Sequence, residues 1–234
     1  MSGHSKWATT KRHKAVVDAK RGAIFTKIGN QIAIAARAGT DPTTNAALQM
    51  ILEKARSANM PKANIDRALA RASDKNAADL IEETYEAYGP GGVGIIVEIA
   101  TDNKNRTMPA VRHALEKNGG RLAEPGSVMF QFARKGVIFV PARGDEVVMV
   151  ALEAGAEDVV EEDDGVTIYT AGGDLAKVRS GLIDGGFEVG SAELQYVPST
   201  MVAVEGDVVG KVEKILEAVD DLDDVVAVHT NAEM

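Results

Sequence analysis

The fold is decided by the stretch from Gly136 to Tyr196, which reads GVIFVPARGDEVVMVALEAGAEDVVEEDDGVTIYTAGGDLAKVRSGLIDGGFEVGSAELQY. Short β-branched runs alternate with segments of helical periodicity, and Gly and Asp residues separate them. The pattern predicts strand, helix, strand, strand, helix and strand at Gly136–Val140, Asp145–Ala154, Asp158–Glu161, Val166–Thr170, Asp174–Ile183 and Glu188–Tyr196. This β-α-β-β-α-β order is that of the split βαβ, or ferredoxin-like, unit.

The segments on either side of this unit each predict a β-α-β run. After a short strand at Thr84–Tyr88, the upstream run comprises Val93–Thr101, Thr107–Asn118 and Ser127–Phe132. The downstream run comprises Met201–Val204, Val208–Ala218 and Val225–His229. Together these runs predict a second ferredoxin-like unit, into which the first is inserted.

The first third of the chain predicts helices only. Apolar residues recur there at spacings of three and four, first as Phe25, Ile28, Ile32 and Ala36 and then as Leu48, Ile51, Leu52 and Ala55. Pro61 suits the start of a third helix, with Ile65 and Leu69 on its buried face. The small, polar Ser73–Asp79 predicts a linker.

The predicted fold class is therefore α+β, with three domains. A basic helical domain comprises residues 1–79, and a discontinuous ferredoxin-like domain comprises 80–133 and 199–234. The inserted ferredoxin-like domain comprises 134–198.

Composition limits the classes of function. The 234 residues include no cysteine, which excludes disulfides, thiolate nucleophiles and thiolate-bound zinc or iron–sulfur centres. The longest stretches without a charge are 11 residues, whereas a membrane-spanning helix needs about 20, so no membrane partner is expected. No apolar signal segment follows Met1, and we expect a cytoplasmic protein.

Charge is distributed unevenly. The net charge is −9, but residues 1–75 hold 14 Lys and Arg against 5 Asp and Glu, and the remainder holds 12 against 30. A concentrated positive end on an acidic protein indicates a polyanionic partner, because Lys and Arg neutralise backbone phosphates and release counterions. The alternative is a solvated helix face, with the single Trp7 in a domain contact.

The predicted nucleic-acid-binding residues lie mainly in this basic third, where Trp7 could stack on a base. Arg67 and Arg71 are four residues apart and share a helix face. Lys104 and Arg106 begin a predicted helix, where cations oppose the helix dipole slightly; a turn-and-cap role for 101–107 is the alternative. The full set is Lys6, Trp7, Lys11, Arg12, Lys14, Lys20, Arg21, Lys27, Lys62, Arg67, Arg71, Lys104 and Arg106.

No motif in the sequence predicts catalysis. The glycine-rich Tyr88–Gly94 has neither the Walker lysine nor the helix that a dinucleotide fingerprint needs, which leaves a tight turn or a loop that a partner approaches closely. The four histidines lack metal-ligand spacing. We expect a non-enzymatic protein with no metal, no cofactor and no small-molecule substrate.

Several segments together resemble the YebC/PmpR family. They are Gly3–Trp7, Asp18–Gly22, Ile24–Lys27, Ala58–Lys62, Tyr88–Val93, Thr101–Thr107, Lys117–Gly120 and Gly126–Val128. The resemblance implies a helical N-terminal domain with two α/β domains. It also implies a DNA-binding transcriptional regulator or, alternatively, a translation factor. Mitochondrial relatives are translational activators, and bacterial members have been linked to ribosomes stalled on proline-rich stretches.

Three functions therefore stay open. The first is a regulator of gene expression that binds DNA through the basic helical domain. The second is a ribosome-associated factor that contacts ribosomal RNA with the same surface, since phosphate contacts look alike on DNA and RNA. The third is an enzyme or small-ligand sensor built on the ferredoxin-like units, which host many functions.

Overall fold

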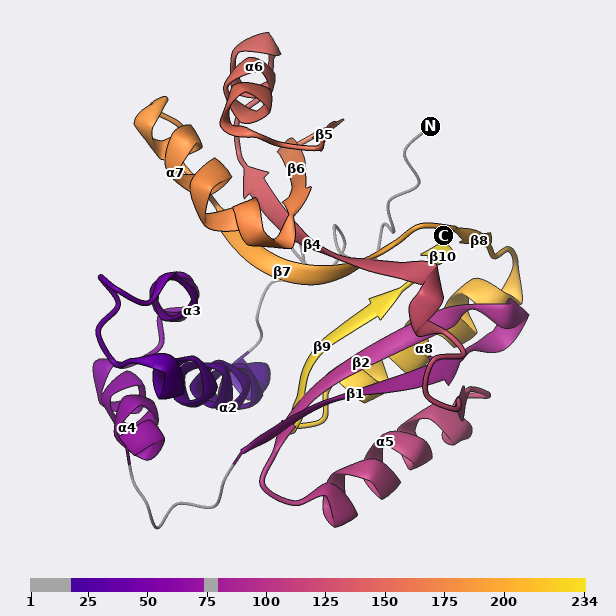
Figure 1. Cartoon of the computed structure of the whole chain (residues 1–234). Helices are drawn as coiled ribbons and strands as arrows, with labels where there is room; N and C mark the ends of the chain where they lie inside the picture. Colours follow the sequence, from indigo (N-terminus) through magenta and orange to yellow (C-terminus); the bar gives the residue numbers. More distant parts are fainter. Residues whose placement is uncertain (1–17, 74–79) are drawn as a thin grey trace. The chain divides into compact units, whose positions relative to one another are not determined.

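The structure is a computed structural model that describes residues 18–73 and 80–234. Among these residues, contacts within the chain divide it into two compact units. One unit is Ala133–Val197, and the other contains the helices before it, the strands and helix up to Phe132, and the C-terminal segment from Pro198 (Figure 1). The mixed α+β class is confirmed, whereas the predicted boundaries of three domains stay a prediction.

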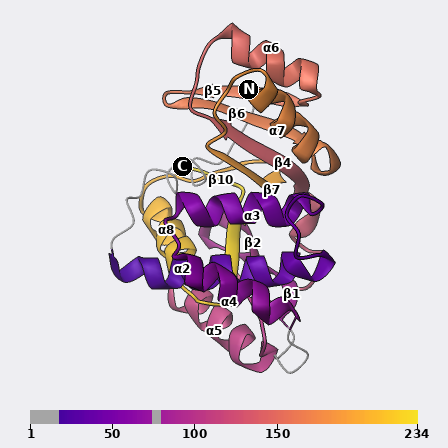
Figure 2. The ribbon, with the colours of Figure 1, turned by 90° about the vertical axis from the view of Figure 1, so that its left-hand side faces the viewer.

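Three α-helices form the first part of the larger unit: α2 (Asp18–Ala35), α3 (Ala46–Ser57) and α4 (Lys62–Ser73). They pack around one another (Figure 2), and the core between them contains Ile28, Ile32, Leu48, Leu52 and Ala68. Both predicted apolar faces are thus confirmed. The predicted linker at Ser73–Asp79 lies almost wholly outside the described residues.

Two local signals place the helix ends. Gly39 has a φ of 145°, a conformation that favours glycine, and follows the short 3-10 helix η1 (Ala36–Ala38). The Asn45 side chain accepts a hydrogen bond of 3.0 Å from the Leu48 amide and thereby caps α3.

The sheet of the larger unit has the strand order β3-β1-β2-β9. Its strands are β1 (Ile81–Tyr88), β2 (Gly94–Thr101), β3 (Arg121–Leu122) and β9 (Val225–Thr230). Helices α5 (Lys104–Lys117) and α8 (Asp207–Asp220) cover one face, where Val111 and Ile215 pack on Val97. On the other face, α2 approaches β2 and β9.

One predicted strand of this sheet is wrong, and another lies in a different sheet. Ser127–Gln131 is a loop with the 3-10 helix η3 (Met129–Gln131), and the two-residue β3 takes the place of the expected strand. The strand predicted at Met201–Val204 is present but does not join this sheet. The strand β8 (Val202–Ala203) pairs with β10 (Ala232–Glu233) in a separate small sheet. The fourth strand of the sheet is instead β1, which pairs with β2 over its full length. Because β1 lies between β2 and β3, it splits the β2-α5-β3 unit.

The smaller unit matches its predicted element order. Strands β4 (Phe132–Val140), β5 (Asp158–Glu162), β6 (Gly165–Ala171) and β7 (Ser191–Pro198) have the sheet order β5-β6-β4-β7. Helices α6 (Asp145–Ala154) and α7 (Leu175–Asp184) connect them. Because β6 lies between β4 and β5, and β4 between β6 and β7, both β-α-β connections are split as predicted.

Candidate nucleic-acid interface

Six of the thirteen predicted residues have side chains that the structure does not describe. Lys6, Trp7, Lys11, Arg12 and Lys14 lie outside the described residues, and Lys20 lies in α2 at a point where the side chain is not described. The structure therefore gives the geometry of seven of the thirteen predicted residues.

Three predicted cations are exposed on the helices, namely Arg21 on α2 and Lys62 and Arg67 on α4. A fourth cation, Arg56 in the last turn of α3, is also exposed and was not predicted. Arg56 and Lys62 flank the turn between α3 and α4, in which the Met60 amide donates to the Ala55 carbonyl. The exposed cations of this turn and of α4 are called the α3–α4 surface below: Arg56, Lys62 and Arg67.

Lys27 has a different environment, because its side chain is only 12% exposed. Its Nζ donates to the backbone carbonyl of Asp220, the last residue of α8, and lies 3.2 Å from that residue's carboxylate. A cation at a helix C-terminus interacts favourably with the helix dipole. Lys27 thus joins α2 to α8 rather than lying on the exposed face of α2.

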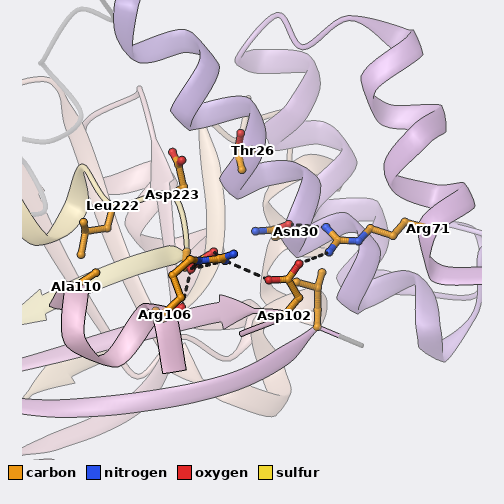
Figure 3. A pocket seen from close by; sticks show the side chains of 11 residues that line it. Thr26, Asn30, Arg71, Asp102, Arg106, Ala110, Leu222 and Asp223 are labelled. Atoms are coloured by element: carbon orange, nitrogen blue, oxygen red, sulfur yellow. Dashed lines mark hydrogen bonds and ion pairs between the residues drawn. The ribbon is translucent and has the colours of Figure 1, made fainter. Parts of the chain in front are cut away.

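The remaining three predicted cations, Arg71, Lys104 and Arg106, are ion-paired around one carboxylate-rich corner. Figure 3 shows Arg71 and Arg106 on either side of Asp102. Asp102 lies between two arginines, 3.7 Å from Arg71 and 3.1 Å from Arg106. Arg106 also contacts Asp224 at 2.8 Å, and the Lys104 Nζ lies 2.9 Å from Glu83. These residues come from α4, the first turn of α5 and the strands beside it.

Asp224 accepts hydrogen bonds from three side chains of this corner. Its carboxylate accepts hydrogen bonds from the Thr107 hydroxyl at 2.6 Å and from the Thr101 hydroxyl at 3.3 Å, besides the contact with Arg106. Burial raises the pKa of Asp224, but the hydrogen bonds from Thr107 and Arg106 outweigh it and hold the pKa below its ordinary value. Asp224 in turn raises the pKa of Arg106.

A cavity of about 520 Å³ opens beside this corner, between the helices and the sheet of the larger unit. Arg71, Asn30 and Thr26 line it from the helices, and Asp102, Arg106 and Asp223 line it from the sheet side (Figure 3). The Arg71 guanidinium also donates to the Asn30 side chain at 3.1 Å. The two arginines therefore already have acceptors, and an anion would have to compete with Asp102 for them.

The described residues show two further facts relevant to function. No group of three or more His, Asp or Glu within 18–73 and 80–234 could hold a metal ion. In the same residues, no helix has both the length and the apolar character needed to cross a bilayer.

Two family models together match almost the whole chain. The family model for the TACO1/YebC protein N-terminal domain matches residues 5–75, and the model for the TACO1/YebC second and third domain matches residues 80–232. The chain belongs to the TACO1/YebC family. The family resemblance predicted from the sequence is thus confirmed.

Individual members of the TACO1/YebC family match over almost their whole length. A protein of Moorella thermoacetica is 49% identical and one of Desulforamulus reducens is 46% identical, with 100% of this chain covered and 96% and 99% of the relatives. Both are named probable transcriptional regulatory protein. The crystal structure of a conserved hypothetical protein from Aquifex aeolicus, 39% identical, superposes with a TM-score of 0.91, covering 98% of this chain and 97% of that one.

Within this TACO1/YebC chain, sequence reasoning missed two features of the interface. Arg56 lies in a helix whose periodic apolar residues were noted, and its place in the last turn of α3 was a usable signal. The pairing of Arg106 with Asp224, 118 residues away, has no local signal.

Proposed function

We propose that this chain is a non-enzymatic regulator of gene expression that binds nucleic acid through its basic helical segment. The observation that carries the proposal is the charge distribution, with 14 Lys and Arg against 5 Asp and Glu in residues 1–75 and the reverse excess elsewhere. The names of the relatives, probable transcriptional regulatory protein, support a role in gene regulation.

The proposal assigns the phosphate contacts to two sets of cations. One set is the cations before residue 21, whose side chains lie outside the described part of the chain. The other set is the exposed Arg21, Arg56, Lys62 and Arg67. Lys27, Arg71, Lys104 and Arg106 are engaged by carboxylates of the chain, so a phosphate would gain less from them.

The α3–α4 surface offers cations that can contact backbone phosphates whatever the base sequence. The exposed positions on α4 between Lys62 and Ala70 are Lys62, Ala63, Asp66, Arg67 and Ala70. Asn and Gln, which pair with adenine in the major groove, do not occur among them. Backbone contacts suit duplex DNA and structured RNA equally, so a ribosome-associated factor that contacts ribosomal RNA is the second candidate.

The test is the salt dependence of binding by the full chain. Six phosphate contacts predict a slope of log affinity against log salt of roughly −5 on duplex DNA. The variant Lys62→Glu/Arg67→Glu is expected to lose about tenfold or more in affinity, because two cations become anions. The control Arg112→Glu/Lys117→Glu makes the same charge change at exposed positions of α5 and should bind like the wild type.

A flat salt response would contradict the proposal, as would equal losses in the two double variants. Sedimentation of the tagged protein in a lysate, with and without DNase, distinguishes the two candidate targets. Co-migration with ribosomal particles after DNase favours the ribosomal one, and DNase-sensitive association favours DNA.

A further inference from the structure

Phe130 is the most exposed large apolar side chain among the described residues, at 76%. It lies in η3, within the loop between β3 and β4. Only 4% of the residues in this chain are aromatic. A phenylalanine left in water contributes almost nothing to the core, so its exposure needs another explanation.

The backbone beneath Phe130 is held by a buried carboxylate. Glu86 on β1 is 8% exposed and accepts hydrogen bonds from the amides of Gly126, Val128 and Met129 at 2.5, 2.6 and 2.7 Å. Burial raises the pKa of Glu86, but these three donors outweigh it and lower the pKa from its ordinary value. Glu86 therefore stays ionised and fixes the loop on the side preceding Phe130.

The other side of the loop is fixed as well. Gln131 accepts a hydrogen bond of 2.8 Å from the Asn231 side chain, and its carbonyl accepts one from the Ser199 amide. Val128 is fully buried against Gly94, where a Cβ would lie 2.9 Å from the valine methyl. The ring of Phe130 thus projects from a backbone that is already ordered, which lowers the entropic cost of binding a partner.

Among the described residues of the larger unit, few exposed apolar side chains accompany Phe130. The exposed residues before it in its loop are Glu124, Pro125 and Gly126. The other exposed large apolar residues in the described part of this unit are Ile81, at the far end of β1, and Met108, in the second turn of α5. A protein partner needs a contiguous apolar core around an anchor residue, whereas a nucleobase needs only one flat ring to stack on.

One exposed cation, Arg121, is linked to the loop through Tyr88. Arg121, which is exposed, lies over the ring of Tyr88 at 5.1 Å from its centre, and the hydroxyl of the same tyrosine donates to the Ser127 carbonyl at 2.7 Å. Tyr88 therefore contacts both Arg121 and the loop that contains Phe130. Aromatic rings that stack on bases and cations that contact phosphates together bind single-stranded nucleic acids.

We propose that Phe130 stacks on an unpaired nucleobase and forms, with Arg121, a second nucleic-acid contact of this chain. This inference rests on the proposed function. Ile81 and Tyr88, the two ends of β1, are roughly 23 Å apart at about 3.3 Å per residue. Arg37 contacts the Leu80 carbonyl next to the first end, and Tyr88 contacts the loop at the second end. The helical segment and the loop that contains Phe130 therefore contact opposite ends of one strand.

The experiment measures the affinity of the full chain for single-stranded RNA and single-stranded DNA of about 16 nucleotides, and for a duplex of the same composition. Phe130→Ala should weaken single-strand binding roughly 5- to 100-fold, with duplex binding changed less than about twofold. Phe130→Trp should retain single-strand binding. Weaker binding to single-stranded RNA alone would identify RNA as the source of the base. Weaker binding to both single-stranded RNA and single-stranded DNA would show that either can supply it. Each result supports the proposal.

Two controls make the result specific. Met108→Ala removes another exposed apolar side chain of the same unit and should leave all affinities unchanged. In the Trp7→Phe/Phe130→Trp variant, the only tryptophan is at position 130, and stacking of a base should quench its fluorescence. Circular dichroism should show an unchanged fold in each variant.

Unchanged single-strand affinity in Phe130→Ala would overturn the inference. A parallel loss on the duplex would also overturn it. In either case a steep salt dependence in the wild type leaves the proposed function intact. A wild type that binds no nucleic acid would contradict both proposals.

Discussion

The α3–α4 surface and the corner around Asp102 contain the same kinds of cation in opposite surroundings. Lys62 and Arg67 point to solvent, whereas Arg71 and Arg106 each lie within 4 Å of a carboxylate. One turn of α4 separates Arg67 from Arg71. The comparison teaches that a cation in the sequence can stabilise the fold or attract a phosphate, and that its neighbours in space decide which.

The largest effect on stability is expected from Asp224→Ala at the corner. The substitution leaves the Thr107 hydroxyl and the Arg106 guanidinium without their main acceptor. Because Arg106 is more than half exposed, we expect a loss of about 2 kcal/mol in the free energy of unfolding, measured by urea denaturation. Asp223→Ala, at an exposed position next to it, should stay within about 0.5 kcal/mol. Equal losses would contradict the role given to Asp224.

Acidification should remove part of the same stabilisation. The pKa of Asp224 is lower in the folded protein than its ordinary value of 3.8. Its contribution is therefore fully present above the unfolded pKa and is lost as the pH falls through the lower folded pKa. The stability difference between the wild type and Asp224→Asn should be constant near neutral pH and shrink below about pH 4. A difference that grows on acidification would contradict the assigned sign.

The smallest effect on stability is expected from Arg67→Gln on the α3–α4 surface. An exposed side chain should change the free energy of unfolding by less than about 0.5 kcal/mol. Its effect should instead appear in binding, where the loss of one phosphate contact on duplex DNA makes the salt slope shallower by about 0.9. Arg106→Gln is the matched control, expected to lower stability and to leave the slope unchanged. A shallower slope in Arg106→Gln together with lower stability in Arg67→Gln would contradict the roles assigned to the two regions.

Local patterns in the sequence predicted most of the elements. The apolar spacing from Phe25 to Ala36 is a property of one helix, and the order of elements in 136–196 follows from alternating segments of different period. The prediction of a strand at Ser127–Phe132 was wrong for a physical reason. Most of the segment forms a loop, because the amides of Val128 and Met129 donate hydrogen bonds to the carboxylate of Glu86 on β1. Nothing near residue 127 in the sequence reveals that carboxylate.

The sequence by itself determined the family, the α+β class, the split βαβ order of the smaller unit and the concentration of positive charge in the first third. Only the tertiary structure decided that β1 completes the first sheet, that Lys27 and Arg106 are ion-paired and that Phe130 projects from an ordered loop. The physical reason is that periodicity and charge counts depend only on residues close together along the chain. Strand pairing, ion pairing and exposure depend on residues that folding brings together from other parts of the chain, 118 positions apart in the case of Arg106 and Asp224.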